Sequence, residues 1–272
     1  MEKHLALEDG TVYYQLKGNG PSIVFIHGFL ESHSIWDYFA KEMSYNYQVI
    51  TIDLPGFGNS SVFAETHTME SMAEIVNKIL EKEKIQDCIV VGHSMGGYVS
   101  LALAEKYPEK IEGIVLFHSH AEEDSKQGKT NRNRTIEVVK NNHKNFINSF
   151  IPLLFAEENQ EKYSKEIGEL QKIASNISAE AVIAALAGMR DRESRTNFLS
   201  NFKEPVFFII GKQDSRIQFN EIIAQLSLPK NCEALVLDGV GHMGFIEEQE
   251  ITLLALEHFA ERVFYLHTII KK

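Results

Sequence analysis

The sequence predicts an α/β protein with a mostly parallel central sheet, helices on both faces of that sheet and one inserted helical cap. Three observations lead to this class. Short apolar runs of strand length alternate with helix-like segments in both the first and the last part of the chain. The runs are apolar at consecutive positions, which is typical of parallel strands buried on both faces. The alternation stops in the middle of the chain and then resumes, which indicates an insertion between two strands of one sheet.

The first half of the chain begins with a predicted hairpin. Residues 4–7 and 11–16 form two short strand-like runs around the turn Glu8-Asp9-Gly10. The elements expected after the hairpin are strands at 23–26, 47–52, 88–91 and 111–117, separated by helices at 36–43, 69–81 and 98–107.

The second half begins with the insertion. Residues 121–200 are expected to be helical throughout, and their basic and acidic side chains balance. The elements expected after them are strands at 205–210 and 234–237, a helix at 217–226 and a final helix at 247–266. We therefore expect one core formed by residues 1–120 and 201–272, with residues 121–200 as the cap.

Composition excludes several classes of function. The chain has 272 residues, with 27 Lys and Arg against 38 Asp and Glu, so its formal net charge is −11. Nucleic acids and anionic membrane surfaces both require a positive surface, so neither is an expected partner. No run is long enough to span a membrane and no apolar leader is present, and Cys88 and Cys232 are expected to be buried free thiols. These features favour a cytoplasmic protein with a small-molecule substrate, and they leave its oligomeric state open.

The strongest chemical signal is the segment Gly92-His93-Ser94-Met95-Gly96, which follows a buried strand and precedes a helix. It matches G-x-S-x-G in the strand, turn and helix context that exposes a nucleophilic serine. Side chains at positions 92 and 96 would collide with the neighbouring strand and helix. The turn also places the Met95 amide beside the carbon that Ser94 would attack, where negative charge would develop.

A serine hydroxyl needs a base, and the base needs an orienting group. His242 follows the last predicted strand, so it reaches the same edge of the sheet as Ser94. Asp214 follows the preceding strand and is the expected acid, although its position also suits a turn or helix cap. The competing acids follow the strand that ends at Phe117; they are Glu122, Glu123 and Asp124.

A second oxyanion donor is expected from the loop after the strand at 23–26. The Phe29 amide can point into the site there, while His27 is expected to hold the loop through side-chain hydrogen bonds, a direct substrate role being the alternative. The sequence contains no H-E-x-x-H, no C-x-x-C pair and no P-loop, so we expect no metal and no cofactor.

Taken together, these motifs resemble the α/β-hydrolase superfamily. The similar segments are, in chain order, His27-Gly28, Asp53-Leu54-Pro55-Gly56-Phe57-Gly58-Asn59-Ser60, Gly92 to Gly97, Gly211-Lys212-Gln213-Asp214 and Gly241-His242. The order Ser, Asp, His is the order that this fold uses. The resemblance implies a triad of Ser94, Asp214 and His242 and an oxyanion hole formed by the Phe29 and Met95 amides.

The expected activity is hydrolysis of small esters, thioesters or lactones through an acyl-enzyme. Two alternatives stay open: cleavage of a carbon–carbon bond in a diketone by the same triad, and a non-catalytic ligand sensor. Near the end of the cap, Arg190 is a candidate contact for an acidic substrate group. The alternative for Arg190, Arg192 and Arg195 is pairing with Asp191, Glu193 and surface acids.

Overall fold

The computed structural model describes residues 1–270 and contains one eight-stranded sheet. The strands follow the spatial order β1-β2-β4-β3-β5-β6-β7-β8. The first two pairings, β1 with β2 and β2 with β4, are antiparallel, and every later pairing is parallel. The strands are β1 (Glu2–Leu7), β2 (Gly10–Lys17), β3 (Ser22–Ile26), β4 (Gln48–Ile52), β5 (Cys88–His93), β6 (Ile111–Phe117), β7 (Val206–Gly211) and β8 (Cys232–Leu237).

Burial explains why the central strands are apolar at consecutive positions. Every residue of β3, β5, β6 and β7 is buried, because helices cover both faces of the sheet. The edge strands β1 and β8 alternate between more and less exposed residues instead. The predicted α/β class with a mostly parallel sheet is therefore confirmed.

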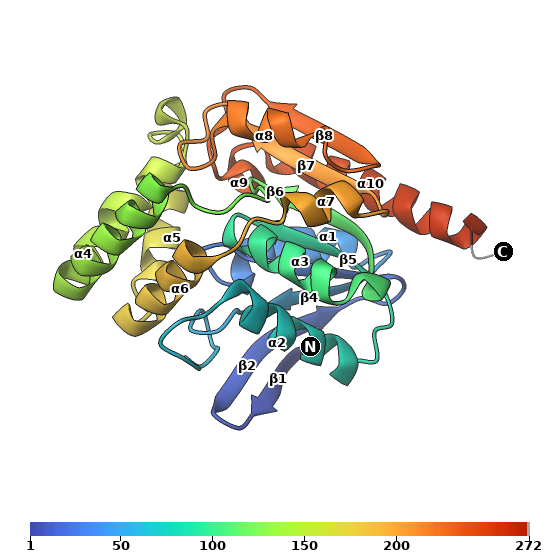
Figure 1. The fold of residues 1–272 in the computed structure, drawn as a ribbon, viewed down its shortest axis with the longest axis horizontal. Helices are drawn as coiled ribbons and strands as arrows, with labels where there is room; N and C mark the ends of the chain where they lie inside the picture. Colours follow the sequence, from blue (N-terminus) through green and yellow to red (C-terminus); the bar gives the residue numbers. More distant parts are fainter. Residues whose placement is uncertain (271–272) are drawn as a thin grey trace.

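The core helices lie in two layers (Figure 1). Helices α2 and α3 pack against each other on one face of the sheet, and α1 and α10 lie on the other. The core helices are η1 (His33–Trp36), α1 (Asp37–Met43), α2 (Met69–Lys82), α3 (Met95–Lys106), η2 (Pro108–Lys110), α8 (Phe219–Gln225), α9 (Gly244–Glu247) and α10 (Gln249–Ile270). Two predicted helices differ by three or more residues at one end. The helix expected at 98–107 begins already at Met95, and the final helix, expected at 247–266, continues to Ile270 and is preceded by the short helix α9.

The segment between β6 and β7 is helical, and its first helices gather at one end of the sheet (Figure 1). Its elements are α4 (Lys126–Phe150), η3 (Pro152–Leu154), η4 (Glu157–Asn159), α5 (Ser164–Ala174), α6 (Ala179–Asp191) and α7 (Thr196–Asn201). Helix α4 is kinked at Asn142, where φ is −155° and ψ is 65°. Helices α4 and α6 pack against each other, so this segment places a wall over the strand ends.

A cluster of aromatic side chains supports the strand ends from within the core. Trp36 is fully buried, and its ring lies 5.0 to 5.7 Å from the rings of Phe25, Phe39, Phe117 and Phe245. Rings at such distances pack edge-to-face or tilted and are stabilising beyond their buried area. Within residues 1–270, no helix is long and apolar enough to cross a membrane.

Candidate active site

Ser94 lies at the junction of β5 and α3 in a strained backbone conformation. Its φ is 50° and its ψ is −114°, a region that non-glycine residues rarely occupy. Three hydrogen bonds hold the turn: the Ser94 amide donates to Phe117 O at 2.9 Å, and Ser94 O accepts from the Gly97 amide at 2.9 Å and from Ser119 Oγ at 2.8 Å. The turn leaves the Ser94 side chain partly exposed.

The two glycines that flank Ser94 are required by close backbone contacts. A Cβ atom at Gly92 would lie 2.3 Å from Gly96 O, and one at Gly96 would lie 2.3 Å from Ile26 O. Both distances are far below van der Waals contact. A side chain at either position would therefore collide with neighbouring backbone, as expected from the sequence.

His242 and Asp214 are brought together by the loops after β8 and β7. His242 Nδ1 lies 2.7 Å from Asp214 Oδ2, and both side chains are buried. Asp214 Oδ1 accepts from the amides of Arg216 at 2.7 Å and Ile217 at 3.0 Å. The aspartate thus caps the following turn and orients the imidazole at the same time. Burial opposes its ionised form, but the charge of His242 and hydrogen bonds from both neighbouring histidines hold the Asp214 pKa below its usual range.

A second histidine, which the sequence reasoning missed, lies against the same carboxylate. His118 directly follows β6 and has a φ of 47°. Its Nδ1 lies 3.4 Å from Asp214 Oδ2, and its Nε2 accepts from the Gly244 amide at 3.2 Å. Burial lowers the His118 pKa to about 4, so the ring is neutral at pH 7. The sequence signal that could have indicated His118 is its place directly after a predicted strand, four residues before Glu122.

Glu31 and His93 form a second unpredicted pair behind the site. Glu31 Oε2 accepts from the Gly28 amide at 2.6 Å and lies 3.0 Å from His93 Nδ1. His93 Nε2 then donates to the backbone oxygen of His242 at 2.9 Å. Burial disfavours charge on His93, but Glu31 raises its pKa overall. This chain of bonds connects the loop after β3 with the loop that carries His242.

The two amides expected to act as oxyanion donors are free. Within the described part of the chain, neither the Phe29 nor the Met95 N–H donates a hydrogen bond. His27 is buried; its Nδ1 donates to Gly28 O at 2.7 Å, and its Nε2 accepts from the Leu54 amide at 3.0 Å. Those contacts match the loop-holding role expected for His27.

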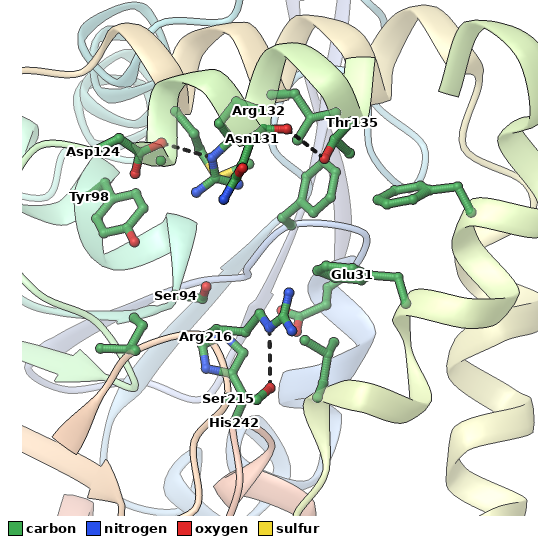
Figure 2. Close-up of a pocket in the computed structure, with 18 residues that line it drawn as sticks. Glu31, Ser94, Tyr98, Asp124, Asn131, Arg132, Thr135, Ser215, Arg216 and His242 are labelled. Carbon is green, nitrogen blue, oxygen red and sulfur yellow. Dashed lines mark hydrogen bonds and ion pairs between the residues drawn. The ribbon is translucent and has the colours of Figure 1, made fainter. Parts of the chain in front are cut away.

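A cavity of about 290 Å³ opens above Ser94 and His242 (Figure 2). The core and the inserted segment both line it. Its apolar wall consists of Phe29, Phe146, Phe150, Leu154, Leu186, Met189 and Ile217. Its polar wall includes Tyr98, Asp124, Asn131, Arg132, Thr135 and Arg216. A concave pocket that combines apolar side chains with directed polar groups is typical of a small-molecule site.

None of the competing acids forms a hydrogen bond with His242 among the described residues. Asp124 accepts from Arg132 Nε at 2.9 Å and from Arg192 Nη1 at 2.6 Å, and Glu123 pairs with Lys129. Glu122 is exposed. The acid in contact with the imidazole is Asp214.

Arg190 is not among the residues that line the cavity. Its guanidinium makes two bonds of 2.7 Å to Asp191 and one of 2.8 Å to Asn133. Asp191 holds it at the end of α6, which is the pairing given above as the alternative to a substrate contact. Arg192 and Arg195 also pair with acids, which are Asp124 for the first and Glu70 and Glu105 for the second.

The side chains of His118, Asp214 and His242 offer donor atoms within 4.8 Å of one another. The ligands of one tetrahedral zinc ion stand about 3.3 Å apart, given metal–ligand bonds near 2.0 Å. The 2.7 Å between His242 Nδ1 and Asp214 Oδ2 is instead the length of a direct charge-assisted hydrogen bond. The three side chains fit a proton-holding network better than a metal centre.

Comparison with known proteins gives consistent matches over nearly the whole chain. The sequence model of a family described as the alpha/beta hydrolase fold matches residues 21–249. A pimeloyl-[acyl-carrier protein] methyl ester esterase from Pseudoalteromonas atlantica is 25% identical, over 93% of this chain and 97% of its own length. A hydrolase of Bacillus subtilis named YugF, itself uncharacterized, is 26% identical over 95% of this chain and 96% of its own. A thermophilic esterase from Thermogutta terrifontis, solved with malate bound, has a TM-score of 0.90 at 27% identity, covering 97% of this chain and 99% of that one.

Proposed function

The chain belongs to the alpha/beta hydrolase fold family and is a hydrolase, and we propose that it cleaves small ester, thioester or lactone bonds with Ser94 as the nucleophile. The observation that carries this proposal is the 2.7 Å hydrogen bond between Asp214 and His242 beside the cavity that Ser94 also lines. In the same proposal, residues 121–200 act as a cap over that cavity.

In the proposed mechanism, His242 removes the proton of the Ser94 hydroxyl as Oγ attacks the carbonyl carbon. The Phe29 and Met95 amides, which have no acceptor within the described residues, donate to the oxyanion. His242 then gives the proton to the leaving group, and an acyl-enzyme remains. Water repeats the cycle: it loses a proton to His242, attacks the acyl carbon, and Ser94 leaves with that proton.

Asp214 acts through His242. Its bond to Nδ1 fixes the tautomer with Nε2 free to accept a proton, and its negative charge stabilises the imidazolium that forms. The esterases among the relatives favour ester hydrolysis over carbon–carbon cleavage.

The test is labelling by a fluorophosphonate, followed by turnover of short p-nitrophenyl esters, lactones and diketones in parallel. Ser94→Ala should abolish the label and lower turnover by several powers of ten, because only the attacking oxygen is removed. Ser215 provides the matched control, since it lines the same cavity. Ser215→Ala should keep the label. A label that persists in Ser94→Ala and disappears in Ser215→Ala would refute the assignment.

We propose a cytoplasmic location as well. Its support is that Cys88 and Cys232 are both unpaired, Cys88 being fully buried. Fractionation of cells that express the tagged full chain tests it.

A further inference from the structure

Arg216 is a cation that lines the active-site cavity. It follows Asp214 by two residues and extends into the cavity beside Ser94 and His242 (Figure 2). Its Nε donates to Ser215 Oγ at 3.2 Å, and its guanidinium lies 5.1 Å from the centre of the Phe150 ring. Among the described residues it forms no ion pair, because the oxygens of Asp214 bind His242 and backbone amides.

A second guanidinium faces the cavity from the opposite wall. Arg132 extends from α4, and its Nε donates to Asp124 (Figure 2). Asp124 is shared with the buried Arg192, whose guanidinium also binds Met189 O and stacks 4.0 Å from the Tyr98 ring centre. One carboxylate therefore serves two arginines, and the terminal nitrogens of Arg132 keep free donors in the part of the chain described.

The remaining charged groups of the cavity do not offset these cations. Glu31, which also lines it, pairs with His93. Asp214 is buried, and its oxygens bind His242 and backbone amides; its charge acts on Arg216 without an ion pair between the two side chains. The excess positive charge is local, because the whole chain has a formal net charge of −11.

Guanidinium groups suit carboxylates, which they bind through two parallel hydrogen bonds. We propose that the substrate is a short ester that carries a free carboxylate, and that Arg216, assisted by Arg132, binds this carboxylate while the ester group lies at Ser94. The cavity of about 290 Å³ is at the small end of ligand sites, which limits the chain between the two groups to a few carbons. This inference rests on the proposed function.

The test compares two esters of nearly equal shape, monomethyl adipate and the methyl ester of adipamic acid, which differ by one negative charge. The wild type should prefer the anionic ester by at least about tenfold in kcat/KM, which is 1.4 kcal/mol. Arg216→Gln should lower this ratio at least tenfold, Arg132→Gln should lower it by a smaller factor, and Arg216→Lys should retain part of it. Arg190→Gln is the matched control, since Arg190 lies outside the cavity, and it should leave the ratio unchanged.

A second pair, the acetate esters of 6-hydroxyhexanoic acid and of its amide, decides whether the acyl half or the alcohol half carries the carboxylate. A wild type without preference for the anionic member of either pair would overturn the proposal, and so would an Arg216→Gln variant with an unchanged ratio. After either result, the proposed hydrolase activity still stands if the neutral esters are cleaved and Ser94 is labelled. Absence of both turnover and label would instead defeat the proposed function, and this inference with it.

Discussion

At the scale of single residues, the contacts of each carboxylate distinguish the acid that orients His242 from the other acids nearby. Asp214 bonds the imidazole of His242, whereas Asp124 bonds two guanidiniums. Asp214→Asn should lower kcat/KM by about 10³ to 10⁴, because the amide favours the wrong tautomer of His242. The rate on a neutral activated ester measures the loss.

Asp124→Asn is the control for that prediction. It removes a charge of the same sign, from a residue that lines the cavity, without touching the imidazole, so the neutral ester should report a loss below about tenfold. A larger loss from Asp124→Asn than from Asp214→Asn would move the acid to the segment after β6.

At the scale of elements, helix α6 rests on the loop before α2 at a glycine. A Cβ atom at Gly188 would lie 1.8 Å from His67 O, while the His67 amide donates to Ala184 O at 3.0 Å. Gly188→Ala must separate the helix from this loop, and we expect it to lower the free energy of unfolding by about 1–3 kcal/mol. Urea unfolding measures the change.

The chain offers a matched control on α5. Gly168 is exposed, and a Cβ atom there would have no neighbour within 4 Å. Gly168→Ala should therefore stabilise the protein by about 0.5–1 kcal/mol, since only the entropic cost of a helical glycine is removed. Equal effects of the two substitutions would show that contact with the loop before α2 does not hold α6.

The elements that the sequence predicted well are those specified locally. A buried parallel strand is apolar at consecutive positions whatever surrounds it, and the G-x-S-x-G pattern of the turn can be recognised within five residues, although the backbone that Gly96 must clear belongs to β3. The site residues at strand ends followed from the same logic, because parallel strands end at one edge. His118 also lies at a strand end. Its contact with Asp214 depends on the conformations of the loops after β6 and β7, which no local sequence pattern predicts.

The inserted segment between β6 and β7 has features that the sequence could not predict. Arg190 and Arg132 both lie on helices of this segment, yet one lies outside the cavity and the other inside it. The difference depends on how α4 and α6 pack against each other, which is a tertiary feature. Arg216 carries no signal in the sequence for another reason: that it forms no ion pair among the described residues is visible only in space.

At the scale of the whole molecule, buried histidines should make stability depend on pH. Burial lowers the pKa of His118 to about 4 and of His120 to about 3, from a reference value of 6.5. Between about pH 4 and 6.5 these rings are neutral in the fold and protonated in the unfolded chain. The unfolded state then binds more protons, so stability should fall as the pH is lowered through this window, by up to about 1.4 kcal/mol per pH unit for each ring.

Denaturant unfolding at pH 7, 5.5 and 4.5 measures this slope. The slope is taken between pH 5.5 and 4.5, because His93, with its raised pKa, gives a contribution that is complete below 6.5 and is lost only at higher pH. His120→Gln should flatten the slope, while replacement of the exposed His258 should leave it as in the wild type. A stability that is constant from pH 7 to 4.5 would contradict the prediction.

The two ends of the inserted segment lie close together, because the Arg195 amide donates to Ala121 O at 2.7 Å beside the paired strands β6 and β7. For the sheet, the segment therefore acts as a closed loop between two neighbouring strands. The entropic cost of closing such a loop grows only slowly with the number of residues in it. The order of the strands therefore depends little on the length of the segment. One part of it supports the core directly, because the His242 amide donates to Leu154 O at 2.7 Å, so the stretch around Leu154 must be kept for the loop of His242. The wall that carries Arg132 lies on α4, and changes there can alter the choice of substrate, in evolution or by engineering, while that support stays in place.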